Sequence, residues 1–221
     1  MLTRGLARLG AVAAIVGTVI GIVFNLLHPR PDELTAAAAV RSATTEDIWI
    51  LDHYMLGLAI GLGFLALVVI GRSFVVTGSV PWARVAVYAA IGSSAIGFAT
   101  IGVDGFAIAQ AAEVAGEEAA VAVAYVGEGL LLATIGSLFG VTPVLFGVAV
   151  LSGDDYPGWL GWVAILAGAI GIVTGSLIFF NGFTALTINT LFPIGSVLYT
   201  LWVGIMGLFL WRKAAALPAT A

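Results

Sequence analysis

The sequence contains no cysteine and very few charged residues. Of its 221 residues only 9% are Asp, Glu, Lys or Arg, against about 25% in a typical soluble domain. Without cysteine the chain has no disulfide framework, no thiolate metal site and no cysteine nucleophile. A soluble globule of this length needs far more polar surface to cover its core. These shortages exclude a soluble enzyme, a disordered chain and a nucleic-acid-binding protein, so no nucleic acid is expected as a partner.

Long apolar runs with few charged residues make up much of the sequence, and hydrophobic residues account for 61% of the chain. The hydrocarbon core of a bilayer is about 30 Å thick, so a spanning helix needs roughly 20 mostly apolar residues. Six runs have about that length: residues 9–27, 48–71, 85–103, 129–151, 159–180 and 190–211. The runs do not alternate apolar and polar residues as the strands of a membrane barrel do. The predicted fold is therefore all-α, a polytopic transmembrane helical bundle of six spans that forms a single domain over residues 1–221.

The basic residues are concentrated on one side of this six-span topology. That side carries Arg4, Arg8, Arg72, Arg84, Arg212 and Lys213, and the other carries only Arg30 and Arg41. Because cytoplasmic loops carry an excess of Lys and Arg, both the N-terminus and the C-terminus are predicted to be cytoplasmic. Most acidic residues, Asp32 among them, lie on the opposite side, so we expect a multi-pass protein of the cell membrane whose outer face attracts cations.

Two segments need a separate interpretation. The first apolar run is longer than the 7–15 residues typical of a signal peptide, so a retained first span is expected. Residues 105–127 are too polar to face lipid but are rich in Ala and Val. They predict an extramembrane helical hairpin, formed by extensions of the third and fourth spans, that turns near Gly116. Pro143, inside the fourth span, predicts a bend.

Glycine pairs four residues apart occur in four of the spans. They are Gly17/Gly21, Gly57/Gly61, Gly136/Gly140 and Gly171/Gly175. Such pairs make a flat groove that lets another helix approach closely. Tight packing within the bundle is one interpretation. Contact with a second copy or with another membrane protein is the other, so a homo-oligomer or a membrane-protein partner stays open.

Five ionisable side chains are predicted to lie at one level, near the outer boundary of the membrane. His28 closes the first span, Asp52 and His53 open the second, Asp104 closes the third and Glu128 opens the fourth. Ionisable groups at such depth usually face protein or water and mark functional sites.

Two polar residues share helical faces with members of this set. Asn25 lies three residues before His28, and Tyr125 lies three residues before Glu128. The hypothesis is a polar cavity in the outer leaflet lined by these seven residues. The alternative is that the charges lie separately in the headgroup layer, where they reach water at little cost.

Three chemistries suit this composition. His28 and His53, with the carboxylates, can hold a divalent metal such as zinc. The same groups can pass protons, because the pKa of histidine lies close to ambient pH. The two histidines can also be axial ligands of a haem b. None of these has a diagnostic spacing, since the sequence has no His-Glu-x-x-His motif and too few histidines for a histidine-rich di-iron site.

Two short motifs carry a family resemblance. They are Ala7-Arg8-Leu9-Gly10 at the start of the first span and Pro157-Gly158-Trp159-Leu160-Gly161 at the start of the fifth. Through them, and through the span pattern, the chain resembles a prokaryotic six-span integral membrane family known only as a domain of unknown function. The resemblance implies the six-span topology, with a long outer loop after the first span, and a place in a prokaryotic inner membrane. It brings no activity and no catalytic residues.

Three functional hypotheses follow from the sequence. In the first, the outer-leaflet cavity binds a small cation, a proton or a lipid-like ligand through His53, Asp104 and Glu128, supported by Asp52 and His28. In the second, the protein is a non-catalytic subunit or scaffold of a membrane complex that packs through its glycine faces. In the third, it is an enzyme that uses the carboxylates as acid and base on isoprenoid or lipid substrates. Membrane lipid is the expected partner in all three.

Overall fold

A computed structural model describes residues 2–29 and 33–217, and every regular element in that part of the chain is helical. The α-helices are α1 (Arg4–Leu27), α2 (Ala36–Thr45), α3 (Trp49–Arg72), α4 (Ser79–Gly102), α5 (Ile108–Ala115), α6 (Glu117–Gly136), α7 (Thr142–Leu151), α8 (Gly158–Asn181) and α9 (Phe192–Ala216). Three π-helical turns, η1 (Val103–Ala107), η2 (Ser137–Val141) and η3 (Thr187–Leu191), lie between them.

Six continuous helical stretches of the described chain are long and apolar enough to cross a membrane. They are Arg4–Leu27, Trp49–Arg72, Ser79–Ala115, Glu117–Leu151, Gly158–Asn181 and Thr187–Ala216. The prediction of an all-α bundle with six candidate spans is confirmed. The third and fourth stretches run on well past the apolar runs seen in the sequence, because α5 extends one and the first turns of α6 extend the other.

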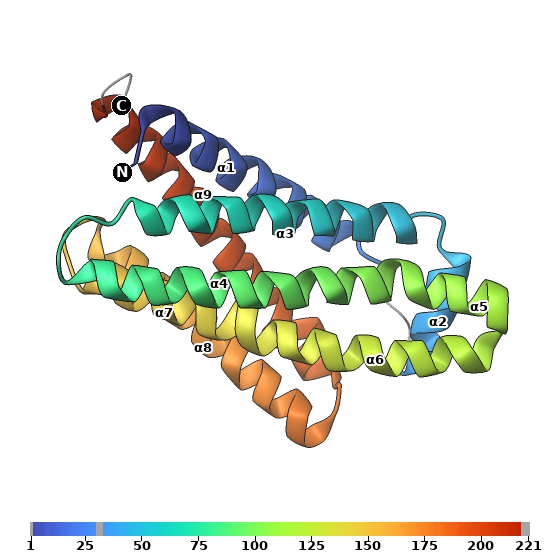
Figure 1. Ribbon diagram of the computed structural model, residues 1–221. Coiled ribbons are helices and arrows are strands. Elements are labelled where there is room, and N and C mark those ends of the chain that lie inside the picture. The colour runs from blue at the N-terminus through green and yellow to red at the C-terminus, as the bar shows by residue number, and fades with distance from the viewer. Residues whose placement is uncertain (1, 30–32, 218–221) are drawn as a thin grey trace.

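The N- and C-terminal parts of the chain lie at the same end of the bundle, called here the terminal end (Figure 1). There Arg4 Nε donates a hydrogen bond of 2.8 Å to the carbonyl oxygen of Leu217. The opposite end, called the hairpin end, holds α2 and the α5–α6 turn (Figure 1). That turn is at Gly116, whose φ of 87° favours glycine.

The assignment of the two ends to the two sides of a membrane stays a prediction, as does the position of the hairpin outside the bilayer. Arg30 and Asp32, two residues used to assign the sides, lie outside the described residues.

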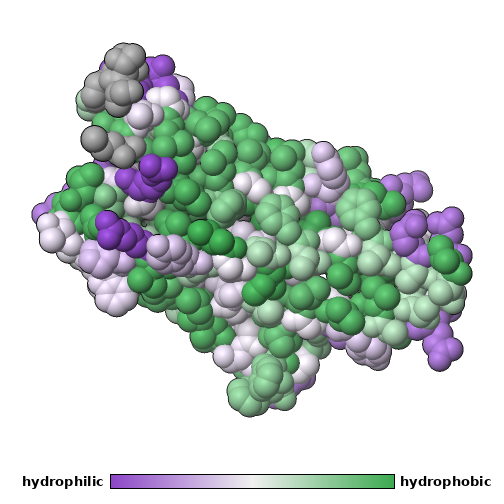
Figure 2. All heavy atoms as spheres, in the orientation of Figure 1, coloured by the Kyte–Doolittle hydropathy of each residue, from purple (hydrophilic) through white to green (hydrophobic). Residues whose placement is uncertain are grey.

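The surface of the bundle is apolar along its middle and polar toward its ends (Figure 2). Large side chains such as Val19, Leu166 and Phe179 are more than half exposed. Soluble proteins rarely expose a continuous apolar surface of this extent. The distribution is that of a multi-pass membrane protein whose middle contacts lipid chains.

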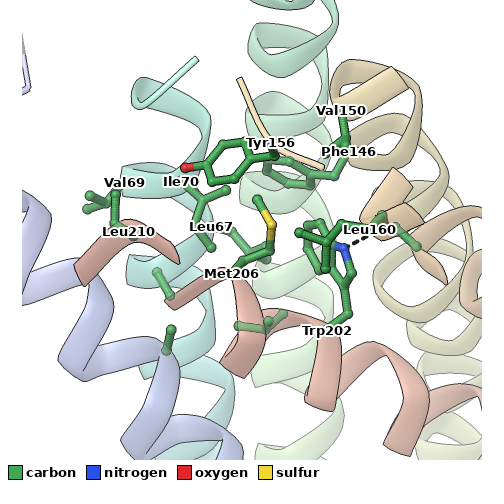
Figure 3. Packing of buried hydrophobic residues seen from close by; sticks show 14 of the residues in the cluster. Leu67, Val69, Ile70, Phe146, Val150, Tyr156, Leu160, Trp202, Met206 and Leu210 are labelled. Carbon is green, nitrogen blue, oxygen red and sulfur yellow. Dashed lines mark hydrogen bonds between the residues drawn. The ribbon is translucent and has the colours of Figure 1, made fainter. Parts of the chain in front are cut away.

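The main core lies in the half of the bundle nearer the terminal end. Figure 3 shows its large side chains from close by. Trp202, Met206 and Phe146 are fully buried there, and Tyr156 packs beside them. The indole nitrogen of Trp202 donates to the carbonyl of Leu160 at 2.9 Å, which satisfies its one polar group (Figure 3). A smaller cluster at the hairpin end joins α2, α5 and α6 to Trp49.

Glycines bring α7 and α8 into close contact. A Cβ atom placed on Gly147 would lie 2.6 Å from the carbonyl oxygen of Gly161, and one on Gly171 would collide with the carbonyl of Phe139. Gly140 likewise faces Ile172 at short distance, whereas Gly136 has open space around it. Gly140 and Gly171 therefore serve packing inside the bundle, as one of the two interpretations of the glycine pairs expects.

Two of the π-turns lie directly before a proline. The turn η2 ends two residues before Pro143, and η3 ends two residues before Pro193. Proline lacks an amide donor and its ring clashes with the carbonyl four residues earlier, and the wider π-turn accommodates both effects. Ahead of Pro143, where the sequence predicted a bend, the structure has the π-turn η2. The third π-turn, η1, has no proline and carries Asp104 instead.

Candidate functional site

Four of the predicted site residues lie together at the hairpin end, and we call them the His–Asp cluster: His28, Asp52, His53 and Asp104. His28 follows the last residue of α1, Asp52 and His53 lie near the start of α3, and Asp104 lies in η1. His28 Nδ1 is 2.6 Å from Asp52 Oδ2, and His53 Nε2 is 3.3 Å from Asp104 Oδ2. Candidate ligand atoms of His28, Asp52 and His53 lie within 4.8 Å of one another.

The hydrogen bonds of the two histidines indicate that Nδ1 carries a proton in both rings. His53 Nδ1 lies 2.8 Å from the carbonyl oxygen of Trp49, which can only accept, so Nδ1 is the donor. His28 Nδ1 donates in the same way to the carboxylate of Asp52. In a neutral imidazole the other nitrogen then holds the lone pair. In that neutral form both Nε2 atoms can accept a hydrogen bond or bind a metal. In a doubly protonated His53, Nε2 instead donates to Asp104 Oδ2, which lies 3.3 Å away.

Trp49 and Gly105 hold His53 in place. The Trp49 ring lies 4.5 Å from the His53 ring and 5.7 Å from the His28 ring, centroid to centroid. Its indole nitrogen donates to the backbone carbonyl of Asp104 at 3.0 Å, which ties α3 to η1. A Cβ atom on Gly105 would collide with the side chain of His53. Trp49 was not among the predicted site residues, although its spacing of four residues puts it on the same helical face as His53.

The inner part of the cluster is fully buried. The side chain of Asp52 is 0% exposed and that of His53 is 1% exposed, whereas those of His28 and Asp104 are 31% and 29% exposed. Asp52 Oδ1 has no hydrogen-bond partner among the described residues. An unpartnered carboxylate oxygen in a buried position is costly. The position of Asp52 therefore calls for positive charge close by.

A cavity of about 280 Å³ extends from the cluster into the centre of the bundle. Of the seven residues that the sequence analysis assigned to one cavity, Asn25, His28, His53 and Asp104 line it at the hairpin end, and Asp52 does not. Ser94 also lines it, ten residues before Asp104 on the same helical stretch, which is about 15 Å further along the axis.

The inner part of the cavity carries two hydroxyl groups without partners. Ser94 and Tyr199 both line the cavity and both are buried. Neither hydroxyl has a hydrogen-bond partner within the described chain. No signal along the chain pointed to Tyr199, because nothing in an apolar span indicates which of its faces meets a cavity.

Glu128 and Tyr125 lie outside the cavity, although the Glu128 carboxylate is near enough to that of Asp104 for the two to repel each other. Neither residue lines the cavity, and the side chain of Tyr125 is exposed. The physical reason is the rotation of α6, whose buried face consists of Ala120, Ala124 and Gly127 and leaves Tyr125 pointing outward. Residue counting placed Glu128 at the right level, but it could not give this rotation.

A haem b between the two histidines does not fit this arrangement. The imidazole rings meet edge to face with centroids 5.1 Å apart, and Trp49 lies against both of them. Axial ligands of one haem stand on opposite faces of the macrocycle, and the direct contact of the rings leaves no slot for it. A single metal ion needs no such slot, and imidazole and carboxylate are donors that it can use.

No protein family matches the chain, and neither the curated proteins nor the solved structures give a significant match. The resemblance to a six-span family therefore rests on its two short motifs and the span pattern alone. Function has to be argued from the site itself.

Proposed function

We propose that this multi-pass membrane protein binds a lipid-soluble small molecule that has an uncharged or cationic polar end. The polar end lies against His53 and Asp104, and the apolar part extends into the bundle. One observation supports this above all: a single cavity connects the His–Asp cluster to an apolar interior. Ligand sites are typically apolar pockets with a few placed polar groups, and roughly 300 Å³ is the lower end of their size range.

The charges at the cavity entrance select the polar end of the ligand. Within the described chain no Lys or Arg side chain lines the cavity, whereas Asp104 does, and Asp52 lies directly behind His28. Charges interact strongly where water is scarce, so an anionic phosphate or carboxylate would be repelled. A hydroxyl or amine group can donate to Asp104 or to His53 Nε2. An alcohol or amine is therefore the favoured class.

The walls of the cavity suit a hydrocarbon chain. Leu56, Ile60 and Phe64 lie four residues apart on α3 and form an apolar stripe along it. Because the spacing follows one face of the helix, the stripe runs away from His53 toward the bundle centre. A flexible apolar chain whose head lies at the cluster would follow this stripe.

The experiment uses farnesol, an isoprenoid alcohol, and the full chain in lipid nanodiscs. We expect farnesol to bind and to raise the unfolding temperature, because a ligand that binds only the folded state stabilises it. Farnesyl phosphate, which has the same chain and an anionic head, should bind much more weakly. Binding is read by native mass spectrometry and by thermal unfolding.

A matched pair of variants ties the binding to the cavity. Gly63 lines the cavity and a Cβ atom there would meet nothing within 4 Å, so Gly63→Leu fills the cavity without a clash at the backbone. Gly92 on α4 has the same open space but lies on the exposed face and does not line the cavity. Gly63→Leu should abolish farnesol binding and Gly92→Leu should not. Equal binding by both variants, or equal binding of the anionic analogue, would rule the proposal out.

A further inference from the structure

We propose that a recess between α3 and α4 at the terminal end binds the headgroup of an anionic membrane phospholipid through Arg72 and Arg84. The recess has a volume of about 280 Å³. His53 and Arg72 lie near opposite ends of α3, about 28 Å apart along the helix axis. None of the described residues that line the recess also lines the cavity at the His–Asp cluster. The inference therefore goes beyond the proposed function and does not depend on it.

Close packing of α3 against α4 brings the two arginines to one recess. A Cβ atom on Gly71 would collide with the side chain of Val87 and would lie 3.5 Å from the carbonyl oxygen of Ala83. The last turn of α3 therefore packs against the second and third turns of α4. Arg72 directly follows Gly71 and Arg84 directly follows Ala83, and both arginines line the recess.

Arg72 and Arg84 differ from the other basic residues of the described chain in having no partner within it. Both are exposed, and neither forms an ion pair, a side-chain hydrogen bond or a cation–π contact with another described residue. Each of the other described basic residues has such a partner: Arg4 the carbonyl of Leu217, Arg8 the ring of Trp211, Arg41 the carboxylate of Glu33, Arg212 the ring of Phe209 and Lys213 the carboxylate of Asp155.

The protein supplies no negative charge to the recess within its described part. No described Asp or Glu lines it. Asp155 bonds the loop between α3 and α4 through the N–H groups of Val75 and Val76, but it does not line the recess either. Two positive charges that share a recess repel each other unless an anion lies near both. The arrangement therefore favours an anionic ligand.

The surroundings of the recess favour a lipid over a free anion. Phe74 and Val87 line it beside the arginines, so an acyl chain has an apolar surface to lie against. Trp82 and Tyr88 are both exposed, one shortly before Arg84 in the chain and one shortly after it. Exposed Trp and Tyr are typical of the level of the headgroups at a membrane surface. A phosphate in the recess would thus lie at the depth where a bilayer carries its own phosphates.

The chemistry of arginine selects an anionic phospholipid. The guanidinium group is always charged, and its planar set of N–H donors matches the oxygens of a phosphate. Basic pockets between membrane helices on the cytoplasmic side bind anionic headgroups, and the basic residues predict that the terminal end lies on that side. A zwitterionic headgroup carries an ammonium group as well, which two arginines repel. A headgroup with net negative charge is therefore the favoured class.

The test uses the full chain in detergent and native mass spectrometry with phosphatidylglycerol and phosphatidylcholine of identical acyl chains. We expect one phosphatidylglycerol per chain to stay bound at concentrations where phosphatidylcholine does not. Arg72→Gln and Arg84→Gln should each lower the affinity for phosphatidylglycerol about 10-fold, because each removes charge-assisted hydrogen bonds to the phosphate. Arg212→Gln is the matched control: it removes the same charge at the terminal end but outside the recess, and should leave the affinity nearly unchanged.

Two further measurements keep folding from deciding the result. Arg72 and Arg84 are exposed and have no ion pair or hydrogen bond within the described chain to lose, so both variants should unfold at the wild-type temperature. Glycerophosphoglycerol, the same headgroup without acyl chains, should not displace the lipid at equal concentration. Equal binding of the two lipids by the wild type, an equal loss of affinity in Arg212→Gln, or displacement by the free headgroup would each overturn the proposal.

Discussion

A single aspartate organises the terminal end of the bundle. The Asp155 carboxylate accepts hydrogen bonds from the backbone N–H groups of Val75 and Val76, both at 3.1 Å, and from Ser79 Oγ at 2.8 Å. Lys213 Nζ lies 3.9 Å from the same carboxylate. One side chain therefore closes the loop between α3 and α4 and connects it to α9.

Tyr156, the next residue, adds a hydrogen bond of known direction. Ser73 Oγ donates to the carbonyl of Ile70 at 2.6 Å, so it accepts from the Tyr156 hydroxyl. Burial raises the pKa of Tyr156 to about 12, from an ordinary value near 10. The hydroxyl therefore keeps the proton that it donates to Ser73 throughout the physiological range.

Replacing Asp155 should destabilise the protein without affecting the cavity. Asp155→Ala leaves two backbone donors and a serine hydroxyl without their acceptor, and hydrogen bonds to a charged group contribute about 1.5–3 kcal/mol. We expect the free energy of unfolding in mixed micelles to fall by about 2 kcal/mol. Asp154→Ala, at the exposed neighbouring position, should change it little. Equal losses in both variants would show that the effect is one of charge rather than of these bonds.

At the scale of helices, the pairs that pack through glycine are the most sensitive. The Gly147 Cα lies so close to α8 that a methyl group would be 2.6 Å from both the Gly161 carbonyl oxygen and Ile165 Cγ1. The Gly161 carbonyl oxygen belongs to the backbone, so it cannot rotate away as a side chain could. The contact between α7 and α8 therefore has no room for even the smallest side chain.

Gly147→Ala should lower the free energy of unfolding by about 1–3 kcal/mol, the usual cost of overpacking. Gly129→Ala on α6 is the control, because Gly129 is exposed and a Cβ atom there meets nothing within 4 Å. Removing the flexibility of glycine from a helix should make that variant neutral or slightly more stable. The two variants are compared by unfolding in mixed micelles. A stabilised Gly147→Ala would mean that α7 and α8 separate easily.

The difference between what could and could not be predicted also lies at this scale. Counting residues along an apolar run gives the depth of a side chain, and it placed His28, Asp52, His53 and Asp104 at one level. It does not give the rotation of a helix about its own axis. For that reason Glu128 and Tyr125 were expected to line the cavity, which they do not, while the inward position of Tyr199 was missed. The sequence also contains no signal for a π-turn that lacks a proline. The turn η1 is of this kind, and it positions Asp104 against His53.

At the scale of the whole molecule, a labelling experiment can test which end of the bundle lies on the cytoplasmic side. The chain has no cysteine, so an introduced cysteine is a unique label. Val114 at the hairpin end and Val75 at the terminal end are both exposed. If the basic residues mark the cytoplasmic side, Val114→Cys should react in intact cells with a maleimide that cannot cross membranes, and Val75→Cys only after lysis. The reverse pattern would place both termini outside.

Gly105 has no functional group, yet it decides how near η1 comes to His53. Since even a methyl group at that position would occupy the volume of the imidazole stem, the clearance between the two backbones is set by a hydrogen atom. The arrangement of the cluster thus depends on the missing side chain at Gly105 as much as on the two histidines. A survey of tolerated substitutions should find position 105 as intolerant of change as the two histidines, because a larger residue has no space there.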